Sequence, residues 1–193
     1  MTEQSNTNAM YISKGVIEPG SQGTALFINM RGEKRRLCGS HADYWLAGQL
    51  APASITAPCA ELDALTAAGL IEATDESDNL GRYRLLTRCI IVPAKQKALR
   101  QPLNNDERCV WSWISKAGLR LTVAELICLA QNRIIPTPGL LGAANRQNLV
   151  EAIYSADTIA DNILENLMEH SAMRDVVVDA VFGLLRKRRI ILI

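Results

Sequence analysis

The residue types that most often carry covalent or metal chemistry are few and scattered in this 193-residue chain. Cysteines stand at positions 38, 59, 89, 109 and 128, an odd number at wide intervals with no C-x-x-C pair. His41 and His170 are the only histidines, and neither has a second ligand at metal-binding spacing. The glycines match neither the P-loop nor the dinucleotide-binding pattern. We therefore predict reduced, mostly buried thiols, with no catalytic residue, no metal and no cofactor. The enzyme question stays open, and binding is favoured over catalysis.

Positive charge is the chemistry that the sequence does concentrate. A run of four basic residues follows an apolar helical pattern near the C-terminus: Arg186, Lys187, Arg188 and Arg189. Together with Arg174, these side chains would contact DNA phosphates, which positions a protein on a duplex without reading its sequence. The structural alternative is that cations at the end of a helix complement its dipole and need no ligand.

A second basic run, Lys34, Arg35 and Arg36, falls in the arm of an expected hairpin. Such charges either protect an edge strand from aggregation or clamp an acidic partner peptide or a phosphate. Trp111 is a further candidate for partner binding. It lies two residues from the core-facing Trp113, so on a helix it points elsewhere, and an exposed Trp is a frequent interface anchor.

The overall charge argues against a protein that relies on a strongly basic surface. Lys and Arg number 21 against 20 Asp and Glu, and the two halves are each nearly balanced. Proteins that bind nucleic acid usually carry a basic excess. No apolar run approaches the roughly 18 residues of a membrane span, and the polar N-terminus lacks a secretory pattern. We expect a cytoplasmic protein with no membrane contact.

The pattern of elements predicts an α+β chain, mostly helical, with two winged-helix-like units and small antiparallel hairpins. We expect a disordered tail over residues 1–9, an N-terminal domain over 10–92, a linker over 93–103 and a C-terminal domain over 104–193.

The N-terminal domain is expected to begin with strands. They cover residues 10–17, 24–30 and 34–38, the last two joined as a hairpin. Ser40 is a candidate N-cap, and a helix over about 58–68 ends before Gly69. A strand over 70–73, an acidic loop over 74–81 acting as a wing, and a strand over 83–92 complete the domain.

The C-terminal domain is expected to begin with a helix over about 105–117. Thr122 and Glu125 form a capping box for the next helix, and Asn145 caps a third. Residues 155–193 then read as helix, short turn, helix and strand, which is typical of a helix-turn-helix leading into a wing.

Two family resemblances accompany these patterns. Residues 61–92 and 157–193 resemble the winged-helix superfamily, which implies a fold used in DNA binding, transcription regulation and protein–protein contacts. The segments RRLCGSHADYWLAGQ (35–49) and ELDALTAAGLIEA (61–73) look like precursor-peptide recognition domains of the PqqD type. That resemblance implies a hairpin and winged-helix-like core that binds peptides by adding a strand.

The leading hypothesis is a non-enzymatic regulator that binds double-stranded DNA through Arg174 and the terminal basic run. Its first half would then serve homodimer formation or partner binding. The alternative is a protein- or peptide-binding adaptor without nucleic-acid contact. DNA binding predicts that the four terminal cations lie exposed on one side with Arg174. The adaptor hypothesis predicts that they are scattered or paired with acids, and that an apolar patch near Trp111 is open.

Overall fold

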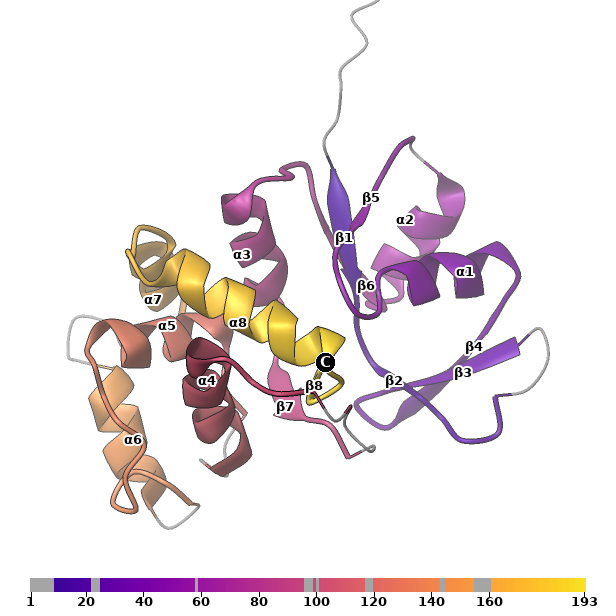
Figure 1. The fold of residues 1–193 in the computed structure, drawn as a ribbon. Coiled ribbons are helices and arrows are strands. Elements are labelled where there is room, and N and C mark those ends of the chain that lie inside the picture. The colour runs from indigo at the N-terminus through magenta and orange to yellow at the C-terminus, as the bar shows by residue number, and fades with distance from the viewer. Residues whose placement is uncertain are drawn as a thin grey trace, which may run out of the picture. The chain divides into compact units, whose positions relative to one another are not determined.

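The computed structural model describes residues 9–21, 25–57, 59–95, 99, 101–116, 120–142, 145–154 and 161–193. These residues form a mixed α+β fold with small antiparallel sheets, as predicted (Figure 1). Contacts divide the chain into two compact units, Met1–Leu85 together with Ile193, and Leu86–Leu192.

The first unit contains a three-stranded sheet in the order β5-β1-β6. Its strands are β1 (Met10–Ser13), β5 (Ala53–Ser54) and β6 (Ile71–Thr74), all antiparallel to their neighbours. All four residues of β1 are buried, which is expected for a central strand. The predicted strand over 10–17 is therefore too long. It splits at Lys14 and Gly15, and its second part, β2 (Val16–Ile17), belongs to another sheet.

That other sheet has the order β2-β3-β4 and contains the predicted hairpin. β3 (Ala25–Met30) and β4 (Glu33–Cys38) pair along their whole length, from Ala25 opposite Cys38 to Met30 opposite Glu33. Arg31 and Gly32 form the two-residue turn with φ values of 54° and 94°. Positive φ at both positions is the type I′ geometry that suits the strand twist, and Gly32 adopts it without strain.

Two helices cover the core of this unit. They are α1 (Ser40–Ala47) and α2 (Ala60–Ala67), which bury Trp45 and Leu65 in a cluster with Tyr11, Ile28 and Leu37. The Trp45 indole N–H donates to the Lys14 carbonyl oxygen over 3.0 Å, so its one polar atom is satisfied. The predicted cap at Ser40 is wrong: Gly39 is the N-cap, without a side-chain bond, and Ser40 donates to Glu61 instead.

The region predicted as wing and strand contains a helix. α3 (Asn79–Thr87) covers the end of the predicted loop and the first half of the predicted strand over 83–92, and only the end of that strand is extended, in β7 (Ile91–Pro93). Residues 75–78, which hold the three acids, form a loop as predicted, and the Asp78 carboxylate accepts a hydrogen bond from the Gly81 N–H over 2.9 Å at the start of α3. An Asp at this position stabilises a helix start, so the acidic loop leads into α3 and not into a wing hairpin.

The second unit is largely helical. Its elements after β7 are α4 (Asn105–Lys116), α5 (Val123–Gln131), α6 (Arg146–Ile153), α7 (Asp161–Glu169), α8 (Arg174–Arg186) and β8 (Ile190–Leu192). Trp113 and Phe182 are fully buried. The capping box is confirmed, with Thr122 and Glu125 each bonding the other's backbone. Asn145 is the N-cap of α6, but its side chain bonds the Pro138 and Leu141 carbonyls instead of capping.

The terminal helix–turn–helix–strand order is confirmed, but the strand is not part of a wing hairpin. β8 pairs antiparallel with β7, so Ile91 lies opposite Leu192. α8 ends in a turn that two backbone hydrogen bonds close. The N–H of Arg188, whose φ is 54°, donates to the Leu185 carbonyl, and the N–H of Arg189 donates to the Leu184 carbonyl. The basic run thus forms the turn between the last helix and the last strand.

Several expectations lie partly outside the described residues. The predicted tail over 1–9 is described only at Ala9, which is buried and whose carbonyl accepts from the Ile55 N–H. Of the predicted linker over 93–103, Ala94 and Leu99 donate backbone hydrogen bonds to Arg189 and Lys187. Residues 58, 117–119 and 155–160 also lie outside the described part.

Candidate functional site

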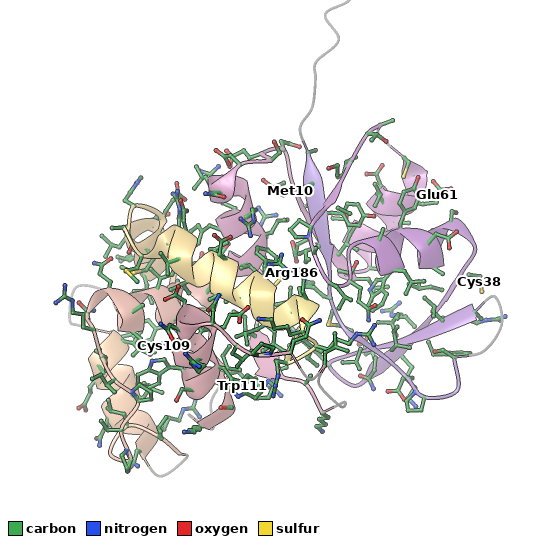
Figure 2. The ribbon with its side chains drawn as sticks, viewed as in Figure 1. Met10, Cys38, Glu61, Cys109, Trp111 and Arg186 are labelled. Carbon is green, nitrogen blue, oxygen red and sulfur yellow. The ribbon has the colours of Figure 1, made fainter. Side chains whose placement is uncertain are left out.

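β4 is an edge strand in the part of the chain that the structure describes, since it pairs with β3 alone. Five of its six residues are exposed, and only Leu37 turns into the core. The three predicted partner-binding cations, Lys34, Arg35 and Arg36, therefore lie on an accessible strand (Figure 1). Figure 2 marks Cys38 at the end of this strand. An edge strand offers unpaired backbone groups to another chain.

The register shows which backbone groups of β4 point outward. In a hairpin with a two-residue turn, the flanking residues Met30 and Glu33 form a hydrogen-bonded pair, and such pairs then alternate with non-bonded ones. Phe27, opposite Arg36, is in a non-bonded pair: its carbonyl accepts from the Glu18 N–H over 2.8 Å, and its N–H donates to Ser21 Oγ over 3.1 Å. The N–H and C=O of Arg36 therefore face the open edge.

By the same alternation, Lys34 and Cys38 also direct their backbone groups outward. The side chains at 34, 36 and 38 share one face of the hairpin, because side chains alternate along a strand. On that face Glu18 accepts from Asn29 Nδ2 over 2.6 Å and pairs with Lys34 Nζ at 3.4 Å. The bond from Asn29, assisted by Lys34, holds the pKa of Glu18 below its usual range.

Arg36 differs from its two basic neighbours. The Lys34 side chain is 65 % exposed but pairs with Glu18, and the Arg35 side chain, 53 % exposed, pairs with Glu33 at 3.0 Å. Among the described residues, no hydrogen bond or ion pair engages the Arg36 side chain. Its guanidinium is thus the available cation of the edge.

The terminal basic run is arranged quite differently. The Lys187 ammonium forms an ion pair with Glu107 on α4 and donates to the Pro102 carbonyl over 2.9 Å. Glu107 is 4 % exposed and also accepts from the Asn104 N–H over 2.8 Å. Burial alone would raise the pKa of Glu107, but the bonds from Lys187 and Asn104, with the charge of Arg186, lower it.

Of the other cations predicted to bind DNA, two contact neighbouring groups of the protein and two are exposed to solvent. The Arg189 guanidinium lies 5.9 Å from the centroid of the Trp111 ring, a cation–π distance. Arg174 bonds Asp175 at 2.8 Å and the Glu169 carbonyl at 2.7 Å. Arg186 and Arg188 are exposed. Trp111, labelled with Arg186 in Figure 2, is half-buried, so the structure does not present it as an open anchor.

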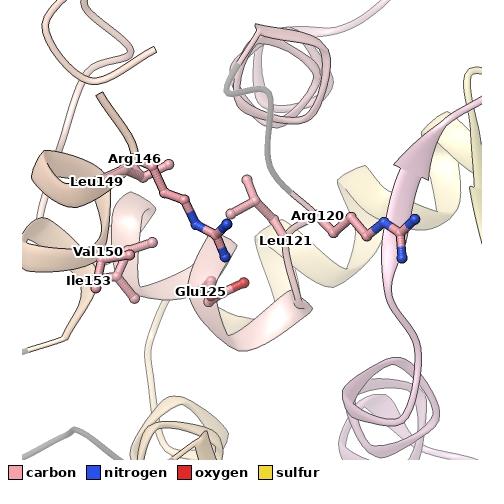
Figure 3. Close-up of a pocket in the computed structure, with 7 residues that line it drawn as sticks. All are labelled: Arg120, Leu121, Glu125, Arg146, Leu149, Val150 and Ile153. Carbon is pink, nitrogen blue, oxygen red and sulfur yellow. The ribbon is translucent and has the colours of Figure 1, made fainter. Parts of the chain in front are cut away.

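A cavity of about 330 Å³ lies between α6 and the start of α5 (Figure 3). Four aliphatic side chains line it together with Arg120, Glu125 and Arg146. Glu125 serves the capping box and accepts from the Tyr154 hydroxyl over 3.0 Å, so its placement is explained by the fold. Arg146 extends toward Glu125 and Arg120 points away. Sequence patterns gave no signal for this cavity beyond the capping box.

None of the five cysteines forms a disulfide, but fewer are buried than predicted. Cys89 and Cys128 are buried, Cys59 is intermediate, and Cys38 and Cys109 are exposed. Cys59 is the N-cap of α2, where its sulfur accepts from the Leu62 N–H. In the described residues, no three His, Cys, Asp or Glu side chains gather in a metal-binding arrangement.

Comparison with known protein families, with curated proteins and with solved structures finds no match for this chain. None of the helices in the described ranges combines the length and the apolar character needed to cross a bilayer.

Proposed function

We propose that this protein is a non-enzymatic adaptor of the cytoplasm that binds an extended peptide segment as an added strand along β4. The observation that carries this proposal is the outward direction of the backbone groups of Lys34, Arg36 and Cys38 on an exposed edge. Strand addition obtains affinity from main-chain hydrogen bonds and specificity from alternate side chains.

The arrangement of the terminal basic run supports the adaptor over the DNA-binding hypothesis. Lys187 is engaged by Glu107, Arg189 by Trp111, and Arg174 by Asp175. The adaptor hypothesis expects cations that are scattered or paired with acids. Its expectation of an open apolar patch near Trp111 receives no support, because Trp111 is half-buried.

The test separates backbone pairing from side-chain charge. A fluorescein-labelled nine-residue peptide that alternates Glu and Val is titrated with the full chain, and anisotropy is recorded. Arg36→Ala and Arg36→Pro both remove the guanidinium, but only proline also removes the outward N–H. Because that N–H has no partner on β3, proline at this edge position leaves the hairpin ladder intact.

We expect saturable binding to the natural chain, and at least about tenfold weaker binding for Arg36→Pro than for Arg36→Ala, since one strand-addition hydrogen bond and its neighbours are lost. Circular dichroism of both variants should match that of the natural chain. Equal affinity of the two variants would rule out strand addition at this edge.

A second candidate, binding to duplex DNA, is favoured by the exposure of Arg186 and Arg188 at the end of α8. Mixed-sequence duplex DNA would be titrated by anisotropy at several salt concentrations. Arg186→Ala combined with Arg188→Asn, which tolerates the positive φ, should weaken binding and reduce the salt slope by about 2. Absence of binding at low salt would eliminate this candidate.

A further inference from the structure

We infer that the segment added to β4 is acidic in alternation, with one carboxylate opposite Arg36 and a second carboxylate two residues away, opposite Lys34. This inference rests on the proposed function, because it names the chemistry of the partner at the same edge. It follows from which side chains share a face with the outward backbone groups.

The pairing geometry fixes that face. A docked strand bonds to the backbone of Lys34, Arg36 and Cys38, so its residues directly opposite these positions place their side chains on the same face. Directly opposed Cβ atoms lie about 5 Å apart, within reach of a carboxylate and a guanidinium. The alternation holds for a parallel or an antiparallel partner, so the prediction does not depend on its direction.

Charge on this face selects acids, most strongly at Arg36. The Arg36 guanidinium, which has no partner among the described residues, can hold a carboxylate by two parallel hydrogen bonds. Lys34 shares its charge with Glu18 at 3.4 Å, so its preference is weaker. Phe27, opposite Arg36 and 37 % exposed, adds an apolar surface that lowers the solvation of this contact.

The opposite face of the hairpin does not select for acidic residues. Arg35 is paired with Glu33 at 3.0 Å, and Leu37 is buried in the core. A residue of the docked strand on this side lies near Arg35, whose charge Glu33 compensates, and near the apolar Leu37. Acids are therefore expected at every second position of the partner and not at consecutive positions.

Isomeric peptides test this pattern. Two eight-residue fluorescein-labelled peptides carry two Glu residues in the same background of Thr and Val, either two positions apart or adjacent. A third peptide carries Gln in place of both Glu. Adjacent acids point to opposite faces, so only one can meet the cationic face at any register. Binding is measured with the full chain, with Arg36→Gln, and with Arg35→Gln as the matched control on the other face.

We expect the alternating peptide to bind up to about fivefold more tightly than its adjacent isomer, which corresponds to one cross-strand ion pair. The Gln peptide should bind more weakly than either. Arg36→Gln should remove the difference between the isomers, whereas Arg35→Gln should preserve it. Arg36→Glu should invert the preference, so that a peptide with alternating Lys becomes the tighter ligand.

The outcomes separate this inference from the proposed function. If all three peptides bind the natural chain equally and Arg36→Pro still binds more weakly than Arg36→Ala, strand addition stands and the acidic pattern is overturned. If none of the peptides binds even at low salt, both the proposed function and the inference fail.

Discussion

Two basic runs of this chain look alike in sequence and lie in opposite environments in the structure. Lys34, Arg35 and Arg36 lie on the exposed edge strand β4, where Lys34 and Arg35 form solvent-exposed ion pairs. In the run Arg186–Arg189, Lys187 is directed to a buried carboxylate and Arg189 to an aromatic ring. The number of charges in a run therefore says less about function than the residues that the run meets.

The two environments give the charges different energetic roles. The Arg35–Glu33 pair is solvated on both sides, with exposed side-chain fractions of 53 % and 72 %, and such pairs contribute about 0–1 kcal/mol. The Lys187–Glu107 pair has exposed fractions of 18 % and 5 %, so removing one partner leaves a carboxylate in a poorly solvated place. The first run can bind a partner at little cost to stability, and the second mainly stabilises the second unit.

The largest test of this contrast is Lys187→Ala. We expect it to lower the free energy of unfolding by about 2–3 kcal/mol, because Glu107 loses its counter-ion while remaining buried. Lys34→Ala, on the exposed edge, should change stability by less than about 0.5 kcal/mol. Urea denaturation followed by tryptophan fluorescence measures both. Equal effects of the two substitutions would refute the contrast between the runs.

The next test is Gly183→Ala, which probes how Glu107 reaches α8. A Cβ at Gly183 would lie 2.2 Å from Glu107 Oε1, too close for any real contact. Gly to Ala inside a helix ordinarily stabilises by about 1 kcal/mol, but here we expect a loss of about 1–2 kcal/mol from the displaced carboxylate. Gly139→Ala, whose Cβ would meet only Thr137 Oγ1 at 3.9 Å, is the control. A gain in stability for Gly183→Ala would show that the carboxylate does not need this space.

The pH dependence of stability is a smaller effect that also arises from the buried carboxylate of Glu107. The pKa of Glu107 is lowered in the folded chain from an ordinary value of 4.5, so its contribution is present above that value and is lost as the pH falls through the folded-state pKa. We expect the stability advantage of the natural chain over Glu107→Gln, about 1 kcal/mol near neutral pH, to shrink below about pH 4.5. Urea denaturation at pH 7 and at pH 3 measures it, and an advantage that grows in acid would contradict the assignment.

Local patterns predicted much of the fold because each rests on contacts within a few residues. The hairpin over 25–38, the capping box of Thr122 and Glu125, and the final helix–turn–helix–strand order all follow from short-range rules. The exposed edge at Lys34, Arg35 and Arg36 followed from the hairpin itself. The outward direction of its backbone groups was not predicted from the sequence, because it follows from the two-residue turn of Arg31 and Gly32 that the structure shows.

The errors arose where a distant partner decides the outcome. Tyr83 and Leu86 are buried on α3, which begins directly after Asp78, whereas the β-branched residues after them favoured one long strand. β8 pairs with β7 across about 100 residues, so no local signal could distinguish it from a wing. The fate of Lys187 likewise depends on Glu107, 80 residues earlier in the chain.

The smallest expected effect is the loss of stability when an exposed cation is removed from either run. We expect this loss to be similar in both runs, although one cation lies on a strand and the other on a helix. Arg35→Ala removes a solvated ion pair, and Arg186→Ala removes a cation from the last turn of α8. Each should cost about 0.3–0.5 kcal/mol at low salt and almost nothing at about 1 M salt, because both interactions are screened. Urea denaturation at the two salt concentrations tests this. If Arg186→Ala keeps a cost above about 1 kcal/mol at high salt, its charge acts on buried Glu107 at short range, and the second run would then stabilise the fold through its exposed members as well.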